Sequence, residues 1–294
     1  MKTFILTARG QSGRGLVAAI SQAAAALECN IIDCSQFVEE ASQTFFLRMS
    51  LRAEGIYSSL ALVSSLTAAG SAVGLDVRLH DTTKKQRVVI FVSRFGHCLN
   101  DLLYRWRIGA LPIEIAAVIS NHKDYEKTVI DHGLPFYFIP VTPATKAAAE
   151  AEQMMVIRKV QADLIVLARY MQVLSDTMCR AMSERIINIH HSFLPSFKGA
   201  NPYGQAFEKG VKLIGATAHY VTADLDEGPI IEQDAIRVTH GQNQDDYVSL
   251  GRDVEAQVLS RAVHAHIHRR VFVNGNKTIV FAASPGTYAS ERMG

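Results

Sequence analysis

The polar stretch Asp81-Thr-Thr-Lys-Lys-Gln-Arg87, followed at once by the apolar run Val88-Val-Ile-Phe-Val92, divides this sequence into two parts. Consecutive polar residues are typical of a connection between elements, and a short apolar run is typical of a buried strand. The pattern of strands and helices differs on the two sides of this point. We therefore expect two domains, residues 1–82 and residues 88–294, joined by a linker at residues 83–87.

The part before the linker alternates short elements in the order βαββαβ. Strands are expected at Thr3–Ala8, Asn30–Val38, Thr44–Arg52 and Asp76–His80, and helices at Leu16–Leu27 and Ile56–Ala72. Gly10, Gly13 and Gly15 lie between the first strand and the first helix, where they indicate a turn or a small-ligand loop. This order predicts a ferredoxin-like α/β domain.

After the linker, strands alternate with helices, which predicts a Rossmann-like, mainly parallel sheet with helices on both faces. Strands are expected at Val88–Val92, Glu114–Ile119, Phe136–Ile139, Leu164–Ala168 and Ile186–Ile189, with helices that include His97–Ile108, Thr145–Gln161 and Ser175–Met182. Further elements are expected at Pro229–Val238, at Asp245–Arg270 as a long helix, and at Val271–Val273 and Thr278–Phe281 as strands. Ligands of such sheets bind at the carboxyl ends of the strands, so we expect the site there.

Composition limits the classes of function. The chain has 30 basic and 28 acidic residues, and a net charge of +2 gives no large field that would attract nucleic acid or a membrane surface. No apolar run reaches the roughly 18 residues of a membrane span, and the first residues do not form a signal peptide. We therefore expect a cytoplasmic protein with a small-molecule partner. The four cysteines form no CxxC pair, which is typical of buried thiols.

Three polar residues stand at the ends of apolar runs in the second part. Asn188 and His190 end one such run, and Asp226 follows the run Val211–Val221. An amide and an imidazole can stabilise a developing oxyanion. A carboxylate in apolar surroundings is expected to have a raised pKa, which suits a general base. These three residues are therefore the candidate catalytic residues for acyl chemistry.

Other interpretations of these residues stay open. A pair of His residues before a turn can simply satisfy local backbone groups, and an acidic residue in a loop can be a solvated turn former. His190, His191, His219 and Asp226 could also be zinc ligands, as in a metal-dependent hydrolase, although adjacent residues on a strand point to opposite faces.

The two motif segments resemble the catalytic segments of the folate-dependent formyltransferases. Asn188-Ile-His190 with Ser192-Phe-Leu-Pro-Ser-Phe-Lys-Gly199 resembles the first, and His219 with Asp226-Glu-Gly-Pro-Ile-Ile resembles the second. This resemblance implies that Asn188, His190 and Asp226 are the catalytic residues. It also implies a folate pocket with the substrate-binding residues Arg169, Met171, Gln172, Val173, Leu174, His219, Val221, Thr222 and Asp224.

A further resemblance concerns the acceptor of the formyl group. Formyltransferases that act on glycinamide ribonucleotide carry a Gly/Ser/Asn-rich loop after the first strand, which holds the phosphate of the amine substrate. Here Ser93–Trp106 stands at that place and, with Leu111–Ile115 and Ile119–His122, resembles the formyltetrahydrofolate deformylases, in which water replaces the amine. The resemblance implies hydrolysis of 10-formyltetrahydrofolate to formate and tetrahydrofolate, without metal or other cofactor. Such a reaction supplies formate and balances the one-carbon folate pool for purine synthesis.

The first part resembles an ACT domain through Gly15-Leu-Val-Ala-Ala19 and Asn30-Ile-Ile-Asp33. This resemblance implies a homo-oligomer formed through that domain and an amino-acid effector bound near Gly15 and Asn30. The Pro-Asp that commonly precedes the first helix of an ACT domain is replaced by Gln11-Ser12. Two other functions remain as alternatives, namely formyl transfer to an amine acceptor such as glycinamide ribonucleotide and amino-acid sensing without catalysis.

Overall fold

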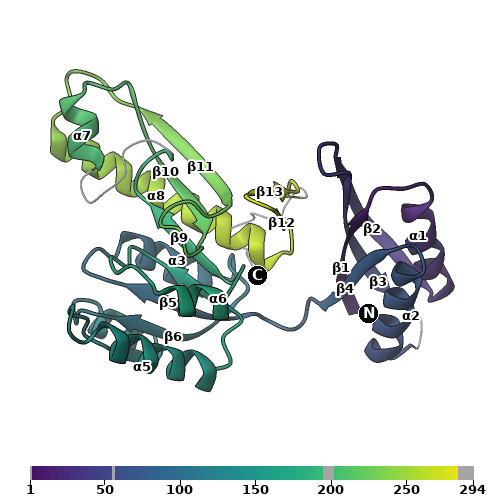
Figure 1. Cartoon of the computed structure of the whole chain (residues 1–294). Coiled ribbons are helices and arrows are strands. Elements are labelled where there is room, and N and C mark those ends of the chain that lie inside the picture. Colours follow the sequence, from purple (N-terminus) through teal and green to yellow (C-terminus); the bar gives the residue numbers. More distant parts are fainter. Residues whose placement is uncertain (1, 55–56, 195–201, 284–294) are drawn as a thin grey trace. The chain divides into compact units, whose positions relative to one another are not determined.

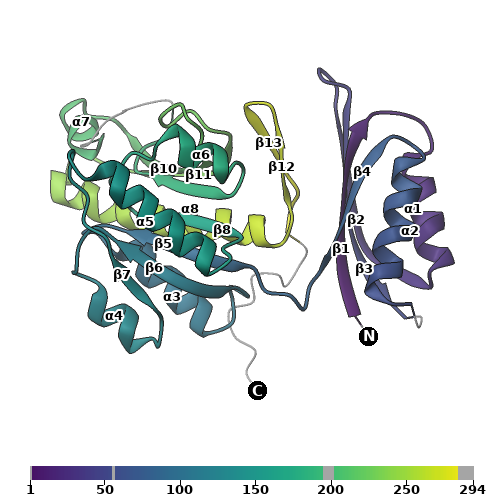
Figure 2. The same cartoon turned by 60° about the horizontal axis from the view of Figure 1, so that its bottom comes forward.

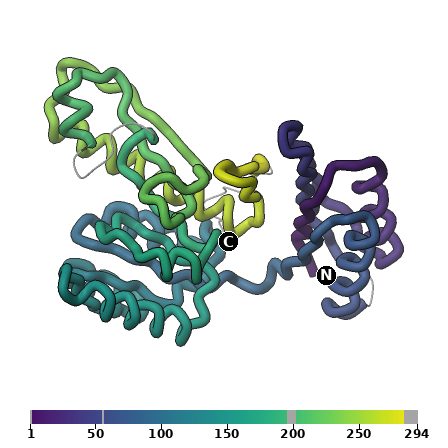
Figure 3. The backbone as a smooth tube through the Cα atoms, in the orientation of Figure 1, coloured from purple at the N-terminus to yellow at the C-terminus, as the bar shows by residue number. Residues whose placement is uncertain are grey.

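A computed structural model describes residues 2–54, 57–194 and 202–283 of the chain. Its contacts divide the chain into two units. The first unit comprises the residues up to 85 together with short segments that begin at His268 and Val280, and the second unit comprises Gln86–Ile267 with a segment from Val273 to Ile279. Figures 1 and 2 show the elements of each unit from two directions, and Figure 3 follows the chain path through each.

The first unit is a four-stranded antiparallel sheet with two helices. Its elements are β1 (Lys2–Gln11), α1 (Leu16–Ala26), β2 (Cys29–Glu39), β3 (Thr44–Ala53), α2 (Ser59–Ser71) and β4 (Leu75–Asp81), and the strand order is β2-β3-β1-β4. Both helices lie on one face of the sheet (Figure 2), where Leu6, Leu47, Ile20 and Leu66 share one buried core. The predicted βαββαβ order is confirmed. Ile56, where we expected the second helix to begin, lies outside the described residues.

The second unit contains a seven-stranded sheet. Its elements are β5 (Arg87–Val92), α3 (His97–Arg107), β6 (Glu114–Ser120), α4 (Glu126–Asp131), β7 (Phe136–Phe138), α5 (Lys146–Lys159), β8 (Leu164–Leu167), α6 (Asp176–Ala181), β9 (Ile186–His190), α7 (Pro202–Glu208), β10 (Leu213–Tyr220), β11 (Ile230–Arg237) and α8 (Gln244–Ile267). The strands β12 (Val271–Asn274) and β13 (Lys277–Val280) form a separate two-stranded sheet, and residues of both units contribute to it. The strand order of the seven-stranded sheet is β11-β10-β9-β8-β5-β6-β7. The strands β5 to β9 pair in parallel, whereas β10 and β11 are antiparallel. The predicted mainly parallel sheet is therefore confirmed.

Two details of the second unit differ from the sequence prediction. The short helix α7 was not predicted, and α4, which lies between two predicted strands, had no predicted bounds. The long helix was expected to reach Arg270, but α8 ends at Ile267. Arg269 has a φ of 53°, a left-handed conformation that cannot continue a right-handed helix. No glycine marks this left-handed position, so the earlier end of the helix could not be predicted.

The parallel strands are covered on both faces. All five residues of the run Val88–Val92 are buried. Val89 and Phe91 share a core with Ile157 of α5 and Met178 of α6. Side chains of a strand alternate between faces, so the others face the opposite layer. On that side α3 and α8 pack together, and α8 runs along β9, β10 and β11 (Figure 1).

The connections around β5 define the place of a ligand. The chain passes from β5 to β6 and β7 on one side, then returns through α5 to β8 on the other side. In an open α/β sheet, the crevice at such a reversal, outside the carboxyl ends of the strands, is where ligands bind. Among the described residues, no helix is both long and apolar enough to cross a membrane.

Candidate active site

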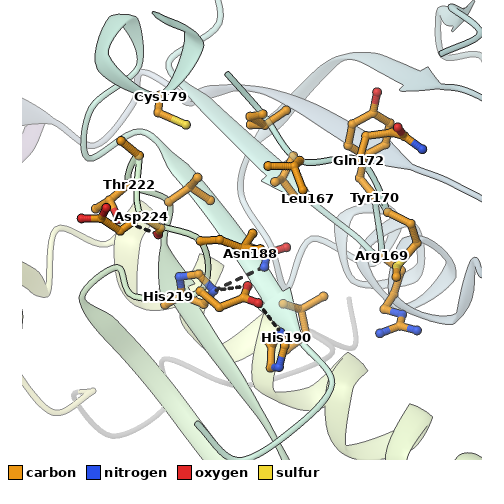
Figure 4. A pocket seen from close by; sticks show the side chains of 18 of the residues that line it. Leu167, Arg169, Tyr170, Gln172, Cys179, Asn188, His190, His219, Thr222 and Asp224 are labelled. Atoms are coloured by element: carbon orange, nitrogen blue, oxygen red, sulfur yellow. Dashed lines mark hydrogen bonds and ion pairs between the residues drawn. The ribbon is translucent and has the colours of Figure 1, made fainter. Parts of the chain in front are cut away.

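The candidate catalytic residues meet at the carboxyl end of β9. Asn188 and His190 are two residues apart on this strand and therefore point to the same face of the sheet. The antiparallel strand β10 places His219 directly opposite Asn188. Asp226 follows in the loop after β10 and has a φ of 56°, which is uncommon for a residue with a side chain. Figure 4 shows the side chains of Asn188, His190 and His219 close together.

The imidazole of His219 orients the amide of Asn188. The Nδ1 atom of His219 lies 2.9 Å from the carbonyl oxygen of Tyr220 and therefore carries the proton. The Nε2 atom of His219 lies 3.3 Å from Nδ2 of Asn188, so it accepts a hydrogen bond from the amide. One amide hydrogen of Asn188 remains for a bound ligand.

His190 contacts the carboxylate of Asp226 through one ring nitrogen. Its Nδ1 atom lies 3.3 Å from Oδ2 of Asp226, and both side chains are largely buried. The Nε2 atom of His190 is buried and has no hydrogen-bond partner among the described residues. Because a buried polar atom is normally paired, this nitrogen is the one that can contact a bound substrate.

The carboxylate of Asp226 is more acidic than we predicted. Apolar surroundings were expected to raise its pKa, but the hydrogen bond from His190 is the largest effect and lowers the pKa, against the opposing effect of burial. The neighbouring rings of His190, His219 and His191 lower it further. Burial lowers the pKa of His219, so its imidazole is neutral at neutral pH. The site therefore combines an ionised carboxylate with a neutral imidazole.

A cleft of ≈ 300 Å³ opens beside these residues. Its lining contains Asn188, His190 and Asp226 and every residue predicted for folate binding, namely Arg169, Met171, Gln172, Val173, Leu174, His219, Val221, Thr222 and Asp224. It also contains Cys179 and Ile189, which sequence reasoning missed. No sequence motif indicated Cys179, because its position in the cleft depends on how α6 packs beside β9.

The segment after β8 is held by polar contacts to its neighbours. It begins at Arg169, which has a φ of 65°. The backbone N–H of Met171 donates to Oγ of Ser93 at 3.0 Å, and the amide of Gln153 donates to the hydroxyl of Tyr170 at 2.9 Å. Burial raises the pKa of Tyr170 to about 12, so the hydroxyl stays protonated. These contacts fix one wall of the cleft before any ligand binds.

A buried charged cluster beside the cleft was not predicted. Ligand-type atoms of His97, Cys98 and Glu255 lie within 4.8 Å of one another, as in sites that hold a metal ion. However, Nε of Arg169 lies 3.2 Å from the carboxylate of Glu255, so a cation of the protein already accompanies it. Across residues 2–54, 57–194 and 202–283, the alternative zinc set around His190 does not form a group of this kind.

The two residues predicted for effector binding are not in one cavity. Gly15, with a φ of 79°, precedes α1 and lines a groove together with Ser12, Gln36 and Phe37. Asn30 is exposed on β2, where it pairs with Arg52 of β3, and it does not line this groove.

Comparison with known proteins agrees with the fold. Residues 86–263 match the family described as formyl transferase. Fold and site therefore define a catalytic unit of the formyl transferase class. A formyltetrahydrofolate deformylase of Corynebacterium sp. is 44% identical over 277 residues, which cover 94% of this chain and 97% of that protein. The crystal structure of a formyltetrahydrofolate deformylase from Pseudomonas syringae has a TM-score of 0.93 and 45% identity, covering 96% of this chain and 95% of that chain. This chain belongs to the formyltetrahydrofolate deformylase family.

A glycinamide ribonucleotide transformylase is a more distant neighbour. The structure of glycinamide ribonucleotide transformylase 1 from Symbiobacterium toebii has a TM-score of 0.64 and 30% identity. The match covers 95% of that chain but only 67% of this one. About a third of this chain therefore has no counterpart in the transformylase, whereas the deformylases match almost its full length.

Proposed function

We propose that this chain is a cytoplasmic formyltetrahydrofolate deformylase that hydrolyses 10-formyltetrahydrofolate to formate and tetrahydrofolate. The observation that carries this proposal is the convergence of Asn188, His190 and Asp226 on one cleft that also contains the whole predicted folate-binding set. In this proposal the pterin binds between the segment Arg169–Leu174 and the loop Val221–Glu227, through backbone groups and apolar walls.

The proposed reaction starts with attack of water on the formyl carbon. Asp226, ionised because its pKa is lowered, takes a proton from the water, directly or through a second water. The carbonyl oxygen becomes an oxyanion, which the remaining amide hydrogen of Asn188 and the ring of His190 stabilise. The unpaired Nε2 atom of His190 supports this role, because it is the ring atom not occupied by Asp226.

Collapse of this intermediate breaks the bond between the formyl carbon and N10. Nε2 of His190 supplies the proton that N10 needs to leave as an amine. Nε2 of His190 then takes up a proton from solvent, and Asp226 releases its proton to solvent, which restores the starting state. Formic acid then leaves and loses its proton to solvent, so that atoms and charges balance.

Formate release without an acceptor tests this function against the alternative. The protein is incubated with 10-formyltetrahydrofolate alone, and formate is measured. Release without any amine is the expected result. Strict dependence on an amine acceptor such as glycinamide ribonucleotide would favour a transferase, and no reaction in either case would favour a sensor without catalysis.

The proposed mechanism uses only side chains of the protein. Water is activated by Asp226 and the oxyanion is stabilised by Asn188 and His190, so no step requires a metal ion or other cofactor. Formate release should therefore keep its rate after treatment with a chelator. Loss of activity that returns with added zinc would favour a metal-dependent hydrolase.

For the first unit we propose a role in assembly. The strand β2 is an edge of the sheet and exposes apolar side chains, among them Ile32 (46% exposed) and Phe37 (45%). Such an edge can pair with a second copy of itself. The double variant Ile32→Asp/Phe37→Asp should have a smaller mass by light scattering than the unsubstituted chain. Equal masses would contradict this role.

We also propose that this unit binds a small amino acid. The groove beside Gly15 lies at the start of α1, which has no side-chain cap, and backbone N–H groups at such a start can accept an anion. Titration of single amino acids into the full chain, followed by calorimetry and by the rate of formate release, tests this proposal. Absence of any heat of binding would contradict it.

A further inference from the structure

A buried tyrosine follows His219 directly on β10 and faces the other side of the sheet. Tyr220 is the last residue of this strand. Side chains of a strand alternate between the two faces, so Tyr220 points away from the cleft that His219 lines. On the far face α8 runs along β10, and the hydroxyl of Tyr220 lies 2.6 Å from Nδ1 of His266 on that helix. The two rings meet edge to face, with centroids 5.7 Å apart. This pair thus joins the strand of the site to the helix behind it.

The main chain of Tyr220 is connected to the proposed oxyanion donor. Its carbonyl oxygen accepts a hydrogen bond from Nδ1 of His219 at 2.9 Å. The opposite ring nitrogen of His219 accepts a hydrogen bond from the amide of Asn188 at 3.3 Å, a contact drawn in Figure 4. The direction of the amide of Asn188 therefore depends, through the imidazole, on where the carbonyl group of Tyr220 lies.

The same residue holds the loop that carries the proposed base. The backbone N–H of Tyr220 donates a hydrogen bond to the carbonyl oxygen of Pro229 at 3.0 Å. Gly228 packs so closely on this residue that a Cβ atom at Gly228 would collide with the carbonyl oxygen of Tyr220. Asp226 lies two residues before Gly228, so the loop of Asp226 returns against the main chain of Tyr220. Both proposed catalytic groups are therefore positioned from this one residue.

The hydroxyl of Tyr220 gives this attachment a direction that apolar packing alone would not give. A hydroxyl is costly to bury unless it makes a hydrogen bond, and its partner then fixes the orientation of the ring. The partner, His266, lies near the end of α8, which extends over Gln244–Ile267 and packs against β9, β10 and β11. Because the same helix supports all three strands, it can hold the end of β10 in register with the strand that carries Asn188.

We propose that Tyr220 and His266 are positioning residues for the hydrolysis, whose hydrogen bond fixes the end of β10 on α8 and thereby aligns Asn188, through His219, with the loop of Asp226. This inference rests on the proposed function and deepens it. Neither Tyr220 nor His266 is assigned contact with the reacting atoms. Both act from the far face of the sheet, through the main chain of β10.

The Tyr220→Phe variant tests this inference, because it removes the hydroxyl and keeps the ring. We expect kcat for formate release to fall roughly 5- to 50-fold, less than the factor of about 10² that a displacement of about 1 Å can cost at a catalytic group. KM should change far less, because the wall formed by Arg169–Leu174 is held by other contacts. Tyr247→Phe is the matched control. This tyrosine is also buried, in a core that it shares with Ile214, and its variant should keep kcat.

Two variants at His266 separate the hydrogen bond from packing. His266→Asn keeps a hydrogen-bonding group near the position of Nδ1, whereas His266→Leu has nearly the same shape as asparagine and no such group. His266→Leu should be about as slow as Tyr220→Phe, and His266→Asn should recover most of kcat. Tyr220→Phe combined with His266→Leu should be no slower than the slower single variant, because the two residues form one unit. Should Tyr220→Phe not fold, the comparison of His266→Leu with His266→Asn still decides.

The Nδ1 proton of His219 gives a readout that needs no turnover. In protein with isotopically labelled histidine, the hydrogen bond to the carbonyl of Tyr220 should protect this proton from exchange with water. Exchange measured by NMR should be faster in Tyr220→Phe and His266→Leu than in the unsubstituted chain, and unchanged in Tyr247→Phe.

Three outcomes would overturn the inference. The first is an unchanged kcat in Tyr220→Phe with only a lower melting temperature, since the pair would then serve stability alone. The second is His266→Asn as slow as His266→Leu, and the third is an unchanged exchange rate of the His219 proton in both slow variants. The hydrolysis itself is judged separately, by formate release from the unsubstituted chain without acceptor, so the two proposals can fail independently.

Discussion

Nδ1 of His190 lies 3.3 Å from the carboxylate of Asp226, although one residue belongs to β9 and the other to the loop beyond β10. This contact keeps Asp226 ionised and orients the ring of His190. The hydrogen bond from His190 is the largest cause of the lowered pKa of Asp226, and it leaves Nε2 of His190 as the ring atom available to substrate. The contact between the two residues therefore keeps Asp226 ionised as the base and orients His190 as the acid.

The Asp226→Asn variant should lose most of its activity. An amide cannot take the proton of the attacking water, and removal of a general base typically costs a factor of about 10² to 10⁴ in kcat. Folate binding should change much less, because the cleft keeps its shape. Formate release and equilibrium binding of tetrahydrofolate measure the two effects. Asp253→Asn, the same change on the exposed face of α8, should behave like the wild type.

The Asn188→Ala variant tests the proposed oxyanion donor. Loss of one such donor typically lowers kcat by a factor of about 10² to 10³, while KM changes little because the interaction forms in the transition state. Steady-state formate release gives both constants. Asn100→Ala, on the exposed side of α3, is the matched control. A variant of Asn188 with nearly unchanged kcat would show that the amide is not part of the reaction.

His219 should act only through Asn188. His219→Phe removes the acceptor that holds the amide, so kcat should fall, but by less than in Asn188→Ala. The double variant should be no slower than Asn188→Ala alone, because the two residues form one unit. His219→Gln, which keeps an acceptor oxygen, should recover part of the loss. Fully additive effects in the double variant would instead indicate that His219 contacts the substrate independently.

The sequence was sufficient for the order of the strands and of the longer helices, and for the prediction that Asn188, His190 and Asp226 lie close to strand ends, because apolar runs bounded by glycine or polar residues mark strands and their ends. It was not sufficient for contacts that depend on packing. Leu225 is next to Asp226 in the chain and led to the prediction of a raised pKa, whereas His190, its neighbour in space, lowers it. Likewise, Glu255 meets His97 only because α8 packs on α3.

The stability of the first unit should decrease on acidification because of His80. Burial and the nearby charges of Arg269 and Arg78 lower the pKa of His80 to about 4, from its ordinary value of 6.5. Between these two pKa values the unfolded chain binds a proton and the folded chain does not, so stability falls as the pH falls. The loss between pH 7 and pH 5 should be about 1–2 kcal/mol. Amide hydrogen exchange in β1 and β4, corrected for the intrinsic exchange rates at each pH, measures this loss of stability. His80→Gln should remove this dependence of stability on pH. If stability varies with pH in the variant as it does in the unsubstituted chain, the dependence belongs to other groups.

Gly228 holds the loop of Asp226 close to β10. A Cβ atom at this position would lie 1.7 Å from the carbonyl oxygen of Tyr220, so Gly228→Ala must shift the backbone. A displacement of about 1 Å at a catalytic group can cost roughly 10² in rate, and we expect a loss of that order in kcat together with a lower melting temperature. In Gly241→Ala the added Cβ meets only Oγ1 of Thr239, at 3.9 Å, so this control should keep both values. Equal kcat and melting temperature in the two variants would mean that the loop tolerates the shift, and the close approach of Gly228 would then not be what positions Asp226.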